Sequence, residues 1–182
     1  TFGGRTPSIV ACTEEYDGSS WSAGGAMIIA TRAHGSTGTQ NAALAFGGNY
    51  PVTTCTEEYN GSTWAAGGAL ITARFYPGGA GTQDSALMFG GCTNTTPSSA
   101  TEEYNGTAWS SGGSMINGRF YLAGFGEQNA ALAVGGSPTT GTEEYDGSTW
   151  TIGETLNKAN GQLAGAGSQN AGVVFGGALC AN

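Results

Sequence analysis

Four adjacent pairs of glutamates are the most numerous chemically reactive groups in this sequence, and they hold 8 of its 13 acidic residues. Paired carboxylates can act as the acid and base of a hydrolase or as ligands of a metal ion. Each pair belongs to a Thr-Glu-Glu-Tyr tetrapeptide that we expect in a β-strand, where neighbouring side chains point to opposite faces. Glu14 and Glu15 then cannot bind one ion together. We expect one glutamate of each pair to meet a cation and the other to be solvated.

The basic residues occur where they could meet these carboxylates. Arg32, Arg74, Arg119 and Lys158 occur once per glutamate pair, and only Arg5 is left over. A guanidinium can bind a carboxylate through two parallel hydrogen bonds. We therefore expect Arg32, Arg74 and Arg119 to form structural clamps between neighbouring units of the fold.

Other catalytic groups are sparse. His34 is the only histidine, and no nucleophile at a fixed spacing accompanies it, which argues against a Ser-His-Asp triad or a histidine-based metal site. The glycine pairs lack the lysine and the helix of a phosphate-binding loop, and no Cys-x-x-Cys spacing suggests zinc. We expect no enzyme activity and no cofactor.

The charge of the chain restricts its partners. The net charge is −8, and only 10% of the 182 residues are charged. Nucleic acids and anionic membranes both attract basic patches, and no stretch approaches the roughly 20 apolar residues of a membrane span. We expect neither a nucleic-acid partner nor membrane insertion.

The elements that must position these residues are repeated four times. The nonapeptide TEEYDGSSW at 13–21 returns in near-identical form at 56–64, 101–109 and 142–150, and each tryptophan is followed 19 residues later by a glutamine. An apolar run and a glycine pair follow that glutamine, as in TQNAALAFGG at 39–48. All length differences fall between the glycine pair and the next nonapeptide. One loop per repeat therefore varies while the rest of the frame is fixed.

Each repeat contains four short predicted strands and no helix. Asp-Gly and Asn-Gly turns predict one hairpin, and the polar turn before the apolar run predicts another. Four-stranded units of this period are typical of β-propellers. We therefore expect a single all-β domain over 1–182, a four-bladed β-propeller. The repeat frames are about 13–48, 56–91, 101–136 and 142–177.

The order of Gly-Gly, Glu-x-Tyr-(Asp/Asn) and Trp resembles the kelch repeat, at Gly47-Gly48, Tyr59, Trp64 and their equivalents. The repeat is shorter than the roughly 50 residues usual for kelch. This short version is similar to kelch-like repeat proteins of bacteriophages and marine microbial genomes, and the resemblance implies a phage origin. The kelch fold also hosts copper radical oxidases, but these need more than one histidine.

The repeated aromatic residues could form a sugar-stacking surface or pack the blades together. Buried aromatic rings provide large contact areas, and propellers commonly use this position between blades, so we expect core packing. The residues are Trp21, Trp64, Trp109 and Trp150, with Tyr16, Tyr59, Tyr104 and Tyr145.

The variable loops are the expected contact surface, because a rigid scaffold commonly presents its binding residues on loops. The candidate contact residues are Tyr50, Pro51, Asn94, Thr95, Thr96, Pro97 and Pro138.

The four cysteines and the two chain ends also belong to these loops. We expect the disulfides Cys12–Cys180 and Cys55–Cys92 in an oxidising setting, with free thiols as the alternative. The segments TFGG at 1–4 and 168–177 both match the second strand of a blade. We expect 168–177 to take that position beside residues 13–21, with residues 1–8 displaced or part of a longer chain.

These observations favour a non-catalytic structural or adhesive module, such as a virion-surface or tail-appendage protein of a phage. Its partners would be other structural proteins, a cell-surface receptor or a glycan, and it could form a homo-oligomer. The alternative is a lectin or a carbohydrate-active enzyme on the same fold. An enzyme would break the fourfold pattern at its site; the largest departures, at 32–36 and 157–162, offer no acid–base pair.

Overall fold

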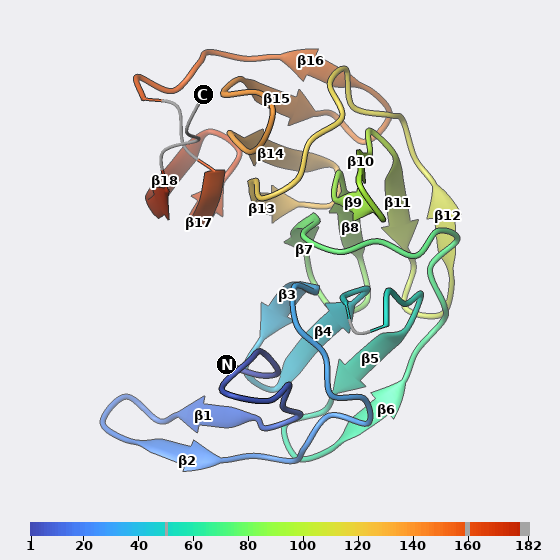
Figure 1. Ribbon diagram of the computed structural model, residues 1–182, viewed down its shortest axis with the longest axis vertical. Helices are drawn as coiled ribbons and strands as arrows, with labels where there is room; N and C mark the ends of the chain where they lie inside the picture. Colours follow the sequence, from blue (N-terminus) through green and yellow to red (C-terminus); the bar gives the residue numbers. More distant parts are fainter. Residues whose placement is uncertain (50, 159–160, 179–182) are drawn as a thin grey trace.

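The computed structural model describes residues 1–49, 51–158 and 161–178, and within these ranges the chain is all-β without a helix. Three four-stranded antiparallel sheets, called blades below, follow one another around an arc (Figure 1). The first blade contains β3 (Gly35–Thr39), β4 (Ala42–Phe46), β5 (Thr56–Tyr59) and β6 (Trp64–Ala66). The second contains β7 (Gly78–Gly81), β8 (Ala86–Phe89), β11 (Thr101–Tyr104) and β12 (Trp109–Ser111). The third contains β13 (Ala123–Glu127), β14 (Ala130–Val134), β15 (Thr142–Tyr145) and β16 (Trp150–Ile152).

Half a blade lies at each end of the arc. The N-terminal half blade is the outer hairpin of β1 (Glu14–Tyr16) and β2 (Trp21–Ala23), and the C-terminal half blade is the inner hairpin of β17 (Gly161–Ser168) and β18 (Ala171–Ala178). They form two separate sheets on either side of the opening in Figure 1. The prediction of an all-β fold is confirmed. The described residues do not close into a ring and form three rather than four four-stranded sheets, so the predicted four-bladed propeller is not confirmed.

The predicted competition at the ring seam has the opposite outcome in the structure. Phe2 forms a β-bridge with Thr13, and Thr1 and Glu14 exchange two backbone hydrogen bonds of 2.8 Å. Residues 1–4 therefore lie in the second-strand position beside β1, and the expectation that 168–177 would displace them was wrong. The short connection to β1 makes this pairing local, so little chain entropy is lost in closing it.

The outer hairpins owe their shape to one side chain in each turn. Asn60 Oδ1 accepts hydrogen bonds from the backbone N–H groups of Ser62 at 3.0 Å and Thr63 at 2.9 Å, while Gly61 supplies the positive φ of 87°. The same Asx turn recurs at Asp146, where the backbone N–H groups of Thr149 and Ser148 lower the pKa of the carboxyl group.

The glycine pairs end the second strands beside the connector that enters the next blade. Gly47 has φ of 67°, and a Cβ atom there would lie 2.5 Å from the carbonyl oxygen of Arg74. Gly48 N–H donates to that same carbonyl at 2.9 Å, and Gly91 repeats the bond to Arg119 at 2.8 Å. Both the backbone conformation and the lack of space therefore require glycine.

A small extra hairpin, β9 (Cys92–Thr93) and β10 (Thr96–Pro97), forms within one variable loop. The constant frame and the variable loop are thus separate parts of each repeat, as the repeat lengths predicted. No helix in the described ranges has the length and apolar character needed to cross a membrane.

Candidate functional site

The tryptophans of the complete blades join each blade to the one before it. Their Nε1–H groups donate to threonine Oγ1 at 2.9 Å in all three cases: Trp64 to Thr13, Trp109 to Thr56 and Trp150 to Thr101. Each ring also packs on a phenylalanine of the preceding unit, with centroid distances of 4.8, 5.3 and 4.9 Å for Phe2, Phe46 and Phe89. These three tryptophans are buried in the core, so their faces are not available to a ligand.

A second set of inter-blade bonds comes from the glutamines. Gln83 Nε2 donates to the carbonyl oxygens of Ala43 at 2.9 Å and Tyr59 at 2.8 Å. Gln128 and Gln169 make the same pair of bonds to the blade before them. One glutamine therefore connects the second and third strands of its neighbour.

The tyrosines form a third set of contacts, with the second glutamate of each pair. The hydroxyl groups of Tyr59, Tyr104 and Tyr145 donate to Glu15, Glu58 and Glu103 of the preceding unit. The expectation that one glutamate of each pair is solvated is therefore wrong for the pairs at Glu57 and Glu102, in which neither glutamate is exposed. It is confirmed for the other two pairs, in which Glu14 and Glu144 are exposed.

The tyrosine contacts predict a loss of stability at high pH. Burial, followed by the hydrogen bond to the glutamate, raises the pKa of Tyr104 and of Tyr145 to about 12. Between the ordinary pKa of about 10 and that value, the unfolded chain releases protons that the folded chain retains. Stability should therefore fall as the pH rises from 10 to 12. Urea melts across this range should show a smaller fall for Tyr104→Phe with Tyr145→Phe than for the wild type, and an equal fall would contradict the assignment.

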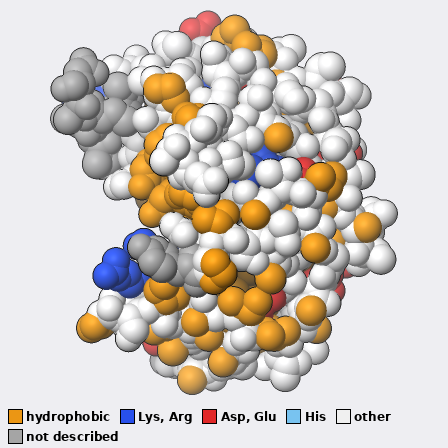
Figure 2. All heavy atoms as spheres, turned by 45° about the vertical axis from the view of Figure 1, so that its right-hand side comes forward, with side chains coloured by type: hydrophobic (Ala, Val, Ile, Leu, Met, Phe, Trp, Pro, Cys, Tyr) orange, Lys and Arg blue, Asp and Glu red, His pale blue; other side chains and the backbone are white. Residues whose placement is uncertain are grey.

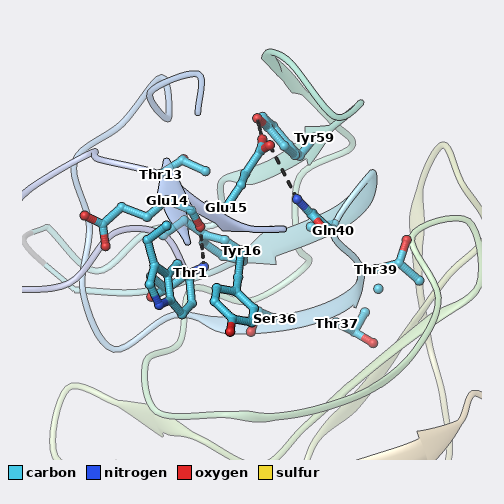
Figure 3. Close-up of a pocket in the computed structure, with 14 residues that line it drawn as sticks. Thr1, Thr13, Glu14, Glu15, Tyr16, Ser36, Thr37, Thr39, Gln40 and Tyr59 are labelled. Carbon is cyan, nitrogen blue, oxygen red and sulfur yellow. Dashed lines mark hydrogen bonds between the residues drawn. The ribbon is translucent and has the colours of Figure 1, made fainter. Parts of the chain in front are cut away.

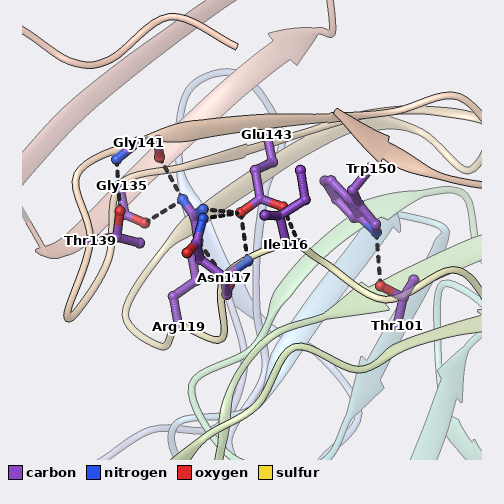
Figure 4. Close-up of polar contacts among 9 residues, drawn as sticks. All are labelled: Thr101, Ile116, Asn117, Arg119, Gly135, Thr139, Gly141, Glu143 and Trp150. Atoms are coloured by element: carbon purple, nitrogen blue, oxygen red, sulfur yellow. Dashed lines mark hydrogen bonds and ion pairs between the residues drawn. The ribbon is translucent and has the colours of Figure 1, made fainter. Parts of the chain in front are cut away.

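In the three complete blades, the first glutamate of the pair binds the connector that enters the blade, as shown for Glu143 in Figure 4. Glu143 accepts backbone hydrogen bonds from Ile116 at 2.7 Å and Asn117 at 3.1 Å and forms a buried ion pair with Arg119. Arg119 also donates to the carbonyl oxygens of Gly135 at 3.3 Å and Gly141 at 2.5 Å. The Glu143 carboxylate thus binds three residues of the connector that enters its blade, Ile116, Asn117 and Arg119.

The second blade repeats this cluster. Glu102 binds Arg74 at 2.7 Å and accepts the N–H groups of Ile71 and Thr72. Burial lowers the pKa of both arginines, and the adjacent carboxylate opposes that shift. Both arginines thus form structural ion pairs, each through one nitrogen–oxygen contact rather than the expected parallel pair.

Arg32 does not occupy the position of these arginines. It forms a β-bridge with Asn49, as Phe75 does with Cys92, and the buried residue Thr31 lies at the Arg74 position. The prediction of a clamp at Arg32 was therefore wrong. Lys158 is exposed on the surface.

The N-terminal half blade differs from the complete blades in leaving a cavity of about 340 Å³ between β1–β2 and the β3–β4 hairpin (Figure 3). Trp21 and Tyr16 line it with their rings 5.2 Å apart. They are 59% and 47% exposed, so the expectation of core packing was wrong for both. Glu15 and Gln40 also line the cavity, and Gln40 Nε2 donates to Glu15 Oε2 at 3.5 Å. Aromatic rings, a carboxylate and an amide around a hollow can bind a polar ligand with an apolar face.

The predicted contact residues of the variable loops lie on the surface. Pro51, Asn94, Thr95, Thr96 and Pro138 are exposed, and Pro97 is half-buried in β10. Tyr50 lies outside the described residues.

The cysteines do not form the expected bond between neighbouring loops. Cys55 and Cys92 are free thiols, as is Cys12, so the Cys55–Cys92 disulfide is absent. Cys180, the predicted partner of Cys12, lies outside the described residues. Burial raises the pKa of the Cys92 thiol, which keeps it protonated and unreactive near neutral pH.

His34 packs beneath the N-terminal segment. Its ring stacks on Phe2 with a centroid distance of 5.5 Å, and burial lowers its pKa to about 4. The imidazole is therefore neutral at pH 7. In the part of the chain that the structure describes, no group of three or more His, Cys, Asp or Glu side chains is arranged to hold a metal ion.

Comparison with known proteins adds no assignment: neither a protein-family model nor a curated protein matches the chain.

Proposed function

We propose that this protein is a non-catalytic structural or adhesive module, a kelch-like repeat of propeller blades on the surface or tail of a phage particle. One observation carries the proposal. The repeated tryptophans, glutamines, tyrosines and first glutamates of the complete blades bind neighbouring blades or connectors. The repetition thus serves assembly of the frame.

The surface chemistry supports an extracellular partner. The chain is acidic, with a net charge of −8, and its exposed loop residues are mainly neutral polar side chains and prolines. Such loops can contact another structural protein, a cell-surface receptor or a glycan. Four-bladed propeller architecture remains part of this proposal, with a fourth blade made from a β17–β18 half and a β1–β2 half.

Loop exchange tests the adhesive role. Replacing Asn94–Pro97 by a Gly-Ser segment of equal length should reduce binding of the labelled chain to host envelope fractions by at least about tenfold, the effect of losing central contacts. The melting temperature should remain within a few degrees, because the loop lies outside the blade frame. Replacing Ser19–Ser20 at an outer turn by Gly-Ser is the matched control, and equal binding by both variants would contradict the proposal.

A second candidate, a carbohydrate-binding lectin, is favoured by the exposed pair Trp21 and Tyr16 beside Glu15 and Gln40. Sugar rings stack their apolar faces on aromatic side chains while their hydroxyl groups bond to carboxylates and amides.

A glycan array separates these two functions. If the cavity binds sugar, the wild type gives glycan-specific signals that Trp21→Ala abolishes and Ile152→Ala, an exposed control on β16, retains. Signals unaffected by Trp21→Ala would place glycan recognition on another surface.

A further inference from the structure

The two half blades expose the side chains that complete blades bury. In the first blade, Leu44 and Phe46 of β4 are 0% and 1% exposed, whereas Val173 and Phe175, their equivalents on β18, are 58% and 55% exposed. Leu44 and Phe46 pair with Glu58 and Thr56 of β5. The outer edge of β18 thus lacks the Thr-Glu-Glu-Tyr strand that covers β4, and the described residues supply none there.

The N-terminal half blade lacks the matching part. Residues 1–4 pair with β1 only near its start, at Thr13 and Glu14, whereas β4 pairs with β5 as far as Tyr59. The cavity beside Glu15 and Tyr16 therefore lies where complete blades have their second strand. The open part of this position corresponds to Gly172–Val174 of β18, the residues that precede its Phe-Gly-Gly segment.

The third blade also presents unused partners toward the missing hairpin. Glu144 is exposed, although its equivalents Glu58 and Glu103 accept tyrosine hydroxyl groups. Within the described ranges, no tryptophan donates to Thr142, the equivalent of Thr56 and Thr101. Tyr16 and Trp21 carry the two donors that these acceptors lack.

We propose that β18 of one copy of this chain pairs with β1 of a second copy, so that β17–β18 and β1–β2 form one complete blade across two molecules. The repeat register aligns Gly172 with Tyr16, Val173 with Glu15, Val174 with Glu14 and Phe175 with Thr13. This interface extends the proposed structural function by naming a partner, a second copy of the chain.

Every inter-blade bond of the frame then has its counterpart across the interface. Gln40 donates to the carbonyl oxygens of Gly172 and Tyr16, as Gln83 does to Ala43 and Tyr59. Trp21 Nε1 reaches Thr142 Oγ1, and the Tyr16 hydroxyl group reaches Glu144. Pairing of exposed strand edges with main-chain bonds and alternate side-chain pockets is an established mode of recognition.

The arc itself favours two molecules over closure of one. Its curvature is held by three equivalent sets of bonds between blades, and its two half blades face the opening from opposite sides (Figure 1). Because β1–β2 and β17–β18 are separate sheets in this chain, pairing them within one molecule requires the arc to close, whereas a second copy can supply β18 without that movement. Figure 2 shows apolar side chains gathered around the hollow of the arc.

The incoming strand replaces residues 1–4 with an identical tripeptide. Phe175-Gly176-Gly177 repeats Phe2-Gly3-Gly4, so Phe175 takes the place of Phe2 against Trp64. The hairpin adds Gly172, Val173, Val174 and the inner strand β17. Because the contact joins different ends of the two molecules, it is head-to-tail and builds rings or chains.

Cysteine crosslinking tests the register between molecules. In a background whose native cysteines are replaced by serine or alanine and whose melt is unchanged, one chain carries Val173→Cys and a second, differently tagged chain carries Glu15→Cys. Mild oxidation of the mixture should yield a heterodimer on a non-reducing gel. Val173→Cys mixed with Ile152→Cys is the control and should yield at least about tenfold less, because Ile152 lies off the proposed edge.

Two further variants separate the outcomes by sedimentation velocity. Phe175→Glu should raise the concentration at the midpoint of association by about 30-fold, as for loss of a central aromatic contact. Phe2→Ser should lower this midpoint concentration, because residues 1–4 then compete less well for the position beside β1.

Crosslinking confined to a single chain carrying both cysteines overturns the proposal in favour of ring closure. Association without the Val173–Glu15 crosslink also overturns it while leaving a structural function intact. Envelope binding that is unchanged by replacement of the Asn94–Pro97 loop would instead contradict the proposed adhesive function alone.

Discussion

Replacing Trp109 by alanine is expected to lower the free energy of unfolding by about 3–5 kcal/mol, as truncation of buried aromatic side chains does. The ring lies between two complete blades, packs on Phe46 with a centroid distance of 5.3 Å and donates to Thr56 at 2.9 Å. Its removal leaves a cavity and an unpaired buried hydroxyl group at Thr56. Urea unfolding followed by circular dichroism measures the effect.

Trp21→Ala is the matched control for this prediction. Trp21 has the same place in the repeat but is 59% exposed, so its loss should cost less than about 1 kcal/mol at dilutions where the chain is monomeric. Equal effects at the two positions would mean that the N-terminal half blade is covered in solution. A loss below about 1 kcal/mol for Trp109→Ala would contradict the account of how the blades are held together.

The second large effect is expected at the buried ion pair. Glu143→Ala should destabilise the chain by about 3–5 kcal/mol, because it leaves Arg119 as an uncompensated buried charge. The same change removes the acceptor of the Ile116 and Asn117 amide groups. Thermal and urea melts should both show the loss.

The adjacent residue provides the control for the ion pair. Glu144→Ala removes an exposed carboxylate from the same strand and should change stability by less than about 0.5 kcal/mol. Adding Arg119→Met to Glu143→Ala should recover part of the loss, since no buried charge then remains. Equal losses for Glu143→Ala and Glu144→Ala would show that the ion pair is not the source of stability.

The repeated frame was predictable because its signals are local and occur four times. Asp-Gly and Asn-Gly turns, glycine pairs and apolar runs mark the same hairpins in each repeat, and the structure forms three complete blades from them. The glutamines were not recognised as inter-blade donors, although the constant 19-residue spacing from tryptophan to glutamine indicated that both are fixed by one geometry. Their role became visible only when the backbone acceptors of the neighbouring blade were known.

The errors occurred where the repeats differ in spacing or lack a neighbour. Arg32 lies 11 residues after its tryptophan, whereas Arg74 and Arg119 lie 10 residues after theirs. Because of this difference of one residue, Arg32 does not occupy the position from which Arg74 and Arg119 bind their glutamates. Trp21 and Tyr16 have the same local sequence as their buried equivalents but lack a preceding blade. Burial of these side chains depends on tertiary contacts, which a repeat pattern does not contain.

The most direct test of the proposed structural role is the location of the protein in its source. Quantitative mass spectrometry of purified phage particles, filaments, secreted material and the soluble cell fraction, with peptides such as 120–158 as the readout, would measure it. We expect several copies of the chain in each particle. The ratio of the chain to other structural proteins should stay constant when the particles are purified through successive density gradients. A chain confined to the soluble cell fraction, with none above background in particles or secreted material, would contradict a virion or extracellular structural module.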